Sequence, residues 1–387
     1  MLKIHAQKTF IDTRLYDSPN CLARLQRMMP FIHTEETGEW TNNSLESVRS
    51  IGRRRHGKDD FTQGTVLAFT TFDEERLGWF YHWRDEASAH GGACQPGMEL
   101  NLVDGCAFRC DYCGFGRYII FYLDAERFVN GLDNVFAQHP EQRLFKYSNT
   151  TDLPAFEPEL DVIRPVVERF AKEPNRYVML FTKSDNVSFL EPIPHGGHTI
   201  ISWSLTCDSA SRLVDRRTAS MQERIAAMAA AQSWGYRVRA RLSPIVPVKD
   251  WRLEYRELFE TLFAMVQPDL VTLELLGWMD VDDLFAIFDR DLLDPAALRS
   301  AELARSALSG VRWGPFTEAT HQEIYRYCID TIQDIPPGTP VALCHGTAAS
   351  WQALGDTMKM TPDHYLCNCG SLSAPGAPLY DHWNKAS

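Results

Sequence analysis

The sequence has no excess of basic residues. Its 387 residues include 39 Lys and Arg against 51 Asp and Glu, a formal charge of −12. Duplex nucleic acid is bound largely by Lys and Arg that neutralise phosphates, so nucleic acid is a disfavoured partner, although a local basic groove is compatible with this composition. We therefore expect a small-molecule substrate.

Long apolar runs are also missing. No segment approaches the roughly 20 apolar residues that span a bilayer, and the start MLKIHAQKTFIDTRLYDSPN lacks the apolar core of a secretory signal. We expect no membrane partner and a cytoplasmic location. There, the ten cysteines are expected to be reduced thiols, some of them metal ligands, because a disulfide framework belongs to oxidising compartments.

The character of the sequence changes near residue 95. Residues 1–95 are expected to form an accessory or lid region, and residues 96–350 the main domain. The basic cluster at residues 53–56 is either a solvated loop or a lid over an anionic substrate. Residues 351–387 read as an irregular C-terminal tail rich in Gly, Pro and Ser.

Between residues 98 and 278 short β-like runs alternate with helical runs. This alternation is typical of an α/β fold and predicts a partial (β/α)6 TIM-type barrel with an N-terminal extension. After residue 280 we expect irregular chain, with a helix near 318–334 and a strand-like piece before Cys344. The expected strands are 98–105, 143–149, 177–183, 199–205, 238–246 and 270–278, and the expected helices between them include 161–173, 221–236 and 251–266.

In such a barrel the catalytic and binding residues lie at the carboxyl ends of the strands. Cys106, Asn149, Lys183 and Ser204 each follow or end a predicted strand, so we expect them to converge on one mouth. Glu274 lies within an apolar strand and should have a partner there, because an unpaired buried carboxylate is costly.

The segment GCAFRCDYCGFG follows the first predicted strand and places Cys106, Cys110 and Cys113 in a C-x3-C-x2-C spacing. Thiolates suit iron–sulfur clusters, and three of them on one compact loop can hold three irons of a [4Fe–4S] cluster. The fourth iron would be open to the amino and carboxylate groups of S-adenosylmethionine (SAM). Tyr112 would then pack against the adenine. A structural zinc site is the alternative, but it usually needs a further Cys or His pair nearby.

This spacing, with an aromatic residue before the last cysteine, is the hallmark of the radical SAM superfamily. Over roughly residues 98–350 the chain resembles spore photoproduct lyase and its relatives, through YSNTTD (147–152), LFTKSDNVSFL (180–190), SWSLT (202–206) and the later segments that begin DRRTASMQER and SPIVPVKDW. The resemblance implies that Thr151, Lys183 and Ser204 help to hold SAM. It also implies reductive SAM cleavage, with an electron donor such as flavodoxin or ferredoxin.

Two departures separate the chain from that family. Spore photoproduct lyase returns a hydrogen atom from a cysteine, assisted by a tyrosine after the third cluster cysteine. The matching positions here are Asn149 and Gly114. We therefore expect radical chemistry on a small-molecule or nucleoside-like substrate, with DNA photoproduct repair through another hydrogen donor as one alternative.

The tail cysteines Cys367 and Cys369 are candidates for a catalytic role. They could supply the missing hydrogen atom, form an auxiliary cluster with Cys94 or Cys344, or hold a soft acceptor for aminocarboxypropyl transfer from SAM, a further alternative function. The alternative is that both are incidental thiols of the tail without a function. If the strand-like VAL at 341–343 joins the barrel edge, Cys344 and His345 would point to the mouth; the favoured alternative is that Cys344 is a packed thiol. We expect Cys21, Cys207 and Cys328 to be packed thiols.

Overall fold

The computed structural model describes residues 1–40, 65–72, 80–81, 92–95, 97–115, 118–309, 314–335 and 338–384. The basic cluster at residues 53–56 lies outside this part of the chain. Among the described residues, no helix is long and apolar enough to cross a membrane.

The main sheet curls into a half-barrel, as predicted. In the described part of the chain it has eight strands, all paired in parallel except the edge strand β4, which runs antiparallel to β5. Its order is β15 (Val341–Leu343), β14 (Val271–Leu275), β13 (Arg237–Ile245), β11 (Thr199–Ser204), β10 (Tyr177–Thr182), β9 (Leu144–Tyr147), β5 (Gly97–Leu100) and β4 (Phe80–Tyr81).

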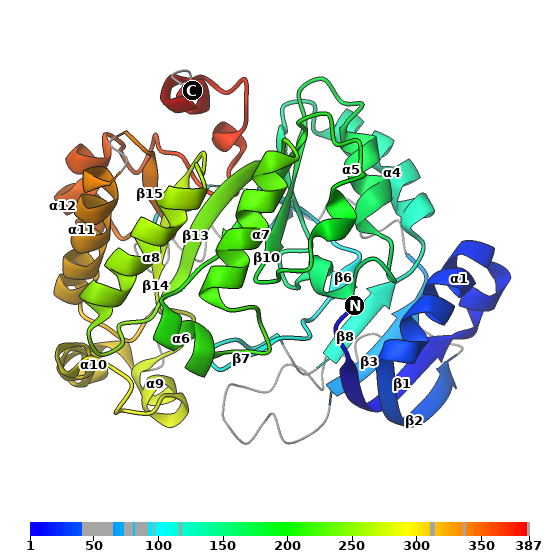
Figure 1. Cartoon of the computed structure of the whole chain (residues 1–387), viewed down its shortest axis with the longest axis horizontal. Helices are drawn as coiled ribbons and strands as arrows, with labels where there is room; N and C mark the ends of the chain where they lie inside the picture. Colours follow the sequence, from blue (N-terminus) through cyan, green and yellow to red (C-terminus); the bar gives the residue numbers. More distant parts are fainter. Residues whose placement is uncertain are drawn as a thin grey trace.

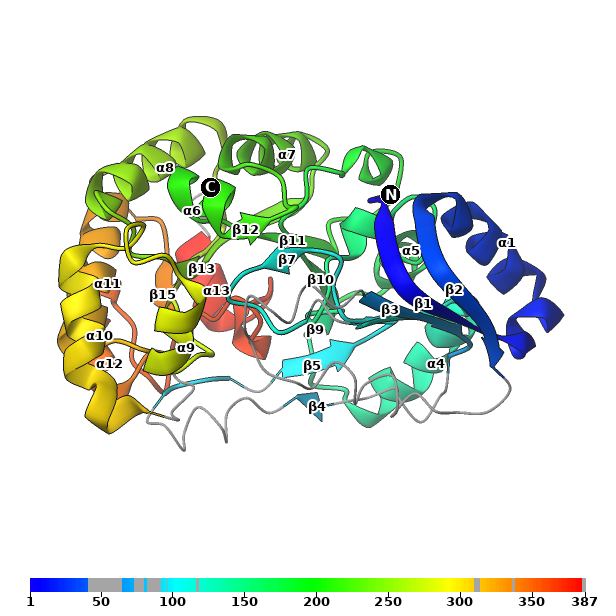
Figure 2. The same ribbon diagram turned by 90° about the horizontal axis from the view of Figure 1, so that it is seen from below.

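Helices cover the outside of this sheet in an arc, which Figure 2 shows from below. Their apolar stripes face the strands: in α5, for example, Ile163, Val166, Val167 and Phe170 are all buried. The helices are α4 (Ala125–Gln138), α5 (Ile163–Phe170), α6 (Asp208–Leu213), α7 (Met221–Ser233), α8 (Trp251–Met265), α9 (Val281–Ile287), α10 (Pro295–Leu308), α11 (Glu318–Asp334) and α12 (Ala348–Met358).

Two sequence-based expectations need correction. The run 98–105 is two strands, because the chain leaves the main sheet after Leu100 and pairs with a different sheet at Val103. The region after residue 280 is helical where irregular chain was expected. Asp294 caps α10 through its side chain, and Pro295 occupies the first turn, where its missing N–H costs nothing.

A second sheet lies at one end of the half-barrel, beside α1 (Pro19–Met28) (Figure 1). It combines N-terminal strands with two strands from beyond residue 95, so its hydrogen bonds cross the boundary expected there. The division at residues 95 and 350 stays a prediction. The strands, in order, are β2 (Ile32–Trp40), β1 (Ile4–Asp12), β3 (Thr65–Thr70), β8 (Tyr118–Tyr122) and β6 (Val103–Asp104).

The C-terminal segment packs back onto the inner side of the half-barrel and ends in α13 (Pro378–Asn384). Arg239 of β13 is fully buried and donates hydrogen bonds to the carbonyls of Asn368, at 2.6 Å, and Ser373. Ser202 of β11 donates to the Asn368 side chain at 3.0 Å. These bonds place the tail against the middle of the sheet.

Candidate functional site

A cavity of about 650 Å³ opens at the carboxyl ends of the parallel strands and extends into the half-barrel. Every site residue that the sequence predicted lies on its wall. The convergence of strand-end residues on one mouth is confirmed. The predicted residues on the wall are Cys106, Cys110, Tyr112, Cys113, Asn149, Thr151, Lys183, Ser204, Cys367 and Cys369.

The three-cysteine loop is fixed by backbone contacts at both ends. Gly105 has a φ of 89°, and a Cβ there would lie 1.9 Å from the carbonyl oxygen of Tyr118, so only glycine fits. The Cys106 N–H donates to the Phe115 carbonyl at 2.6 Å. Cys110 lies in β7 (Arg109–Cys110), which pairs with β12 (Asp215–Arg216). The loop is thus held before any ligand binds.

The chemistry of the three thiols fits an iron–sulfur cluster. All three are free cysteines, and burial raises the pKa of each thiol, so an uncompensated thiolate is disfavoured there. A cation is what would stabilise the ionised sulfurs. Among the described residues, these three sulfurs are not all within 4.8 Å of one another, which is wider than the spacing of the ligands on one tetrahedral ion. A polynuclear cluster holds its thiolates further apart.

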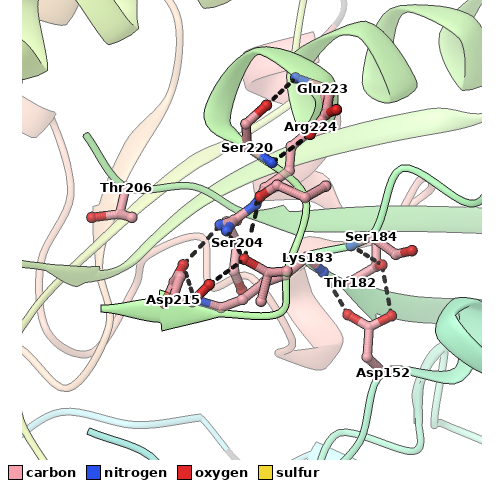
Figure 3. A network of polar contacts seen from close by, with 12 residues as sticks. Asp152, Thr182, Lys183, Ser184, Ser204, Thr206, Asp215, Ser220, Glu223 and Arg224 are labelled. Atoms are coloured by element: carbon pink, nitrogen blue, oxygen red, sulfur yellow. Dashed lines mark hydrogen bonds and ion pairs between the residues drawn. The ribbon is translucent and has the colours of Figure 1, made fainter. Parts of the chain in front are cut away.

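Beside the loop, Lys183 and Arg224 share one buried carboxylate (Figure 3). Asp215 Oδ2 lies 2.8 Å from Lys183 Nζ and 2.9 Å from Arg224 Nη1. Burial opposes ionisation, but the two cations outweigh it and lower the pKa of Asp215. Sequence reasoning missed Asp215 and Arg224 as site residues, although both lie in the segment DRRTASMQER that carried the resemblance.

The SAM-binding candidates have distinct surroundings. Tyr112 donates its hydroxyl proton to Asp215 Oδ1 at 2.5 Å, and its ring lies 5.1 Å from Lys183 Nζ. Thr151 has a buried hydroxyl that has no hydrogen-bond partner among the described residues. Ser204 accepts a hydrogen bond from Arg224 at its carbonyl, 2.9 Å away. An unmatched buried hydroxyl on the cavity wall is the kind of group that a polar ligand satisfies.

Asp152 fixes the end of β10 from the neighbouring loop. Its carboxylate accepts from the Thr182 hydroxyl at 2.9 Å and from the Lys183 N–H at 2.5 Å (Figure 3). Burial raises the pKa of Asp152 to about 6, despite these hydrogen bonds. The contacts determine where the Lys183 side chain leaves the strand.

The tail cysteines form a close pair inside the cavity. Cys367 Sγ and Cys369 Sγ lie 3.9 Å apart. The hydrogen bond from Cys367, with Lys146 and Arg241 nearby, lowers the pKa of Cys369 to about 5, while the pKa of Cys367 is raised. The pair therefore favours one thiolate and one thiol. Cys21, Cys207 and Cys328 are fully buried, as expected.

Glu274 has the partners that its burial demanded. Arg241 Nη2 donates to Glu274 Oε2 at 2.9 Å, and His345 Nδ1 lies 3.0 Å from Oε1. Burial opposes the ionised form, but Arg241 and His345 lower the pKa of Glu274. Strand β15 does join the barrel edge, and Cys344 and His345 line the cavity next to Glu274.

Comparisons with known proteins agree with this fold. The family model for spore photoproduct lyase matches residues 93–278. Solved structures of spore photoproduct lyase variants, one of them with bound AdoMet and a dinucleoside spore photoproduct, superpose with TM-scores of 0.61 and 0.63 at 16% identity. They cover 87% of this chain and 98% of theirs. The half-barrel is therefore the fold of those enzymes.

The chain is also similar in sequence to curated spore photoproduct lyases. The spore photoproduct lyase of Bacillus subtilis (strain 168) is 26% identical over 194 residues, which are 47% of this chain and 57% of that protein. The Clostridium acetobutylicum enzyme is 23% identical over 176 residues, 43% of this chain and 52% of that protein. The alignments thus span little more than half of these relatives. The fold and the three-cysteine loop are those expected of the radical SAM class. Within that class, the chain is similar to spore photoproduct lyase over residues 93–278.

Proposed function

We propose that this protein is a radical SAM enzyme that abstracts hydrogen from a nucleoside-like substrate. Its cofactors, as in its superfamily, are a [4Fe–4S] cluster and SAM. When bound, they supply a 5′-deoxyadenosyl radical on reduction by a donor such as flavodoxin or ferredoxin. The observation that carries the proposal is the cavity itself, which has the three-cysteine loop on its wall and about 650 Å³ of space beside it.

The chain's own residues bind and orient these groups. Cys106, Cys110 and Cys113 would supply the thiolates. Lys183 lies on the cavity wall and would pair with the SAM carboxylate, while Asp215, itself bound to Arg224, holds the lysine ammonium group in place. The unpaired hydroxyl of Thr151 would accept from the SAM ammonium group. Tyr112 and Ser204 would line the same subsite.

A nucleoside-like substrate fits the rest of the cavity. Solved relatives hold a dinucleoside spore photoproduct, so the comparisons give no support to the expectation that nucleic acid is disfavoured. In this chain the cavity cations Lys146 and Arg241 are each paired with a buried carboxylate, Glu99 and Glu274. Among the described cavity residues, these two cations therefore add little net charge, which is compatible with a nucleoside-like substrate.

The tail thiols are our candidates for returning the hydrogen atom. Asn149 lies on the wall where a cysteine would stand in spore photoproduct lyase, and an amide does not readily donate a hydrogen atom. Cys367 and Cys369 line the same cavity. In our proposal, homolysis of the S–H bond of one of them quenches the substrate radical and leaves a thiyl radical beside the second sulfur.

The test uses anaerobically reconstituted full-length protein. We expect about four irons per chain and release of 5′-deoxyadenosine on reduction with dithionite and SAM. Cys110→Ala should lose the 5′-deoxyadenosine, and Cys328→Ala, a buried cysteine outside the cavity, should keep it. Continued release from Cys110→Ala would show the proposal to be wrong. Methylthioadenosine as the product would instead mark aminocarboxypropyl transfer, which no comparison supports.

Photoproduct repair with a new hydrogen donor is a second candidate, favoured by the close Cys367–Cys369 pair. Incubation of the reduced enzyme with dinucleoside spore photoproduct should then yield thymine residues. Cys367→Ala, which removes the protonated thiol of the pair, should lower that yield while 5′-deoxyadenosine release persists. Absence of thymine in the unsubstituted enzyme would leave only the first candidate.

A further inference from the structure

At the edge of the half-barrel, a second and much smaller cavity adjoins the large one. Its volume is about 30 Å³, enough for an ion with one water molecule. Glu274, Cys344 and His345 line both cavities and so form the wall between them. His321 and Trp278 are among the other residues that line the small cavity. The proposed radical chemistry uses none of these groups.

Three donor atoms of different kinds meet on this wall. Cys344 Sγ lies 3.4 Å from His345 Nδ1, which lies 3.0 Å from Glu274 Oε1. Among the described residues, only these three have ligand atoms that are all within 4.8 Å of one another. Ligand atoms on one tetrahedral zinc ion are about 3 to 4 Å apart, given metal–ligand bonds of roughly 2.0 to 2.3 Å. The spacing therefore matches a single ion.

Neighbouring side chains hold the donor groups of Glu274 and His345 in place. Arg241 at 2.9 Å and the Ser243 hydroxyl both donate to Glu274 Oε2, while Oε1 lies towards His345 and also accepts a hydrogen bond from Trp278 Nε1 at 3.1 Å. Trp278 packs edge-on against the His345 ring with centroids 5.4 Å apart. Outer contacts of this kind orient the ligands of metal sites.

The backbone is also constrained at this wall. Trp278 and His345 have φ values of 62° and 57°, a left-handed conformation that side-chain-bearing residues adopt at a cost. Such strain is retained where a side chain must point in one direction. Here it directs His345 towards Glu274 and Cys344.

We propose that Glu274, Cys344 and His345 bind a single zinc-type divalent cation, separate from the three-cysteine loop. Sulfur, imidazole and carboxylate together suit zinc, a borderline-soft ion, better than calcium or magnesium, which prefer oxygen alone. Three protein ligands leave a fourth position open, as in zinc sites that bind water or substrate. The open position adjoins the large cavity, so the ion would take an oxygen, nitrogen or sulfur atom of the substrate.

The site is tested by metal content, in holoenzyme with its cluster reconstituted. We expect one equivalent of zinc beside the cluster iron. Cys344→Ala, His345→Ala and Glu274→Gln should each lower zinc to less than a tenth of an equivalent and leave the iron unchanged. Cys106→Ala should do the reverse, and Cys328→Ala should retain both metals. Because iron and zinc are measured separately, failure of this proposal differs from failure of the proposed function.

A second measurement covers variants that fold poorly. Cobalt added to unsubstituted enzyme from which the zinc has been stripped should produce a thiolate-to-cobalt charge-transfer band with one-to-one saturation. Protein without zinc and without cobalt binding would overturn the proposal. So would additional iron that depends on Cys94, Cys344, Cys367 and Cys369, because that result identifies a second iron–sulfur cluster in place of a single ion.

Discussion

Asp215 and Lys183 form an ion pair beside the three-cysteine loop, with 2.8 Å between Oδ2 and Nζ and no exposed surface on the Asp215 side chain. The aspartate lies in β12, which pairs with the cysteine-bearing strand β7. The lysine comes from the end of β10. This contact therefore joins the cluster loop to the sheet.

Asp215→Asn should destabilise the protein strongly. The substitution leaves Lys183 and the fully buried Arg224 without their shared carboxylate, and removing one partner of a buried ion pair costs about 3 to 5 kcal/mol. Urea unfolding should show this loss. Asp208→Asn is the matched control, because its pair with Arg212 lies at the surface and such pairs contribute about 1 kcal/mol or less. Equal stability of the two variants would contradict the central role of Asp215.

Gly105→Ala should disrupt the cluster loop. A Cβ at Gly105 would lie 1.9 Å from a backbone oxygen, in addition to the strain of a positive φ. Gly197→Ala separates the two effects, because Gly197 also has a positive φ but no atom near the added Cβ. We expect a loss of about 1 kcal/mol for Gly197→Ala and at least about 2 kcal/mol for Gly105→Ala, measured by urea unfolding. Only Gly105→Ala should also lower the iron content.

Arg239→Lys should loosen the tail. Lysine has one ammonium group and cannot contact Asp269 and the carbonyls of Asn368 and Ser373 together as the guanidinium does. We expect alkylation of Cys367 and Cys369, followed by peptide mass spectrometry, to be at least about tenfold faster, the change expected if docking weakens by about 1.4 kcal/mol. Arg256→Lys, at an exposed position of α8 where the ion pair with Glu260 involves no tail residue, is the control. Unchanged alkylation would mean that other contacts hold the tail.

Glu157 should make stability depend on pH. Burial raises the pKa of Glu157 to about 7, although three backbone N–H groups donate to its carboxylate. The folded protein then binds the proton more tightly than the unfolded chain, so the contribution of this group is largest below pH 4.5 and is lost as the pH rises through about 7. The free energy of unfolding of the unsubstituted protein minus that of Glu157→Gln should therefore be about 2 kcal/mol more positive at pH 5 than at pH 8. A pH-independent difference would contradict the raised pKa.

The sequence predicted the parallel strands well, because each is a short apolar run followed by polar residues. It could not show that the chain turns away after Leu100, since Leu102 and Val103, just beyond Asn101, are as apolar as the strand before them. The helix after Asp294 had a recognisable cap and an N-terminal proline, and the irregular reading of that region overlooked both.

The site was predictable to the extent that it depends on local spacing. Cys106, Cys110 and Cys113 lie within one loop, and Lys183 and Ser204 end neighbouring strands. Pairs that form across the sheet carry no such signal. The sequence does not show that the Asp215 carboxylate pairs with both Lys183 and Arg224. Nor does it show that His345 contacts Glu274, because both contacts depend on how the sheet curls.

The docked tail has a consequence for the order of assembly during synthesis. Cys106 leaves the ribosome long before Asn368 and Ser373, whose carbonyls bind Arg239. While the later part of the chain is still being made, the cluster loop can fold with its cavity open on the tail side. The tail therefore docks last and closes this side of the half-barrel, while the cavity at the carboxyl ends of the strands remains the route for iron, sulfide and substrate in the finished protein.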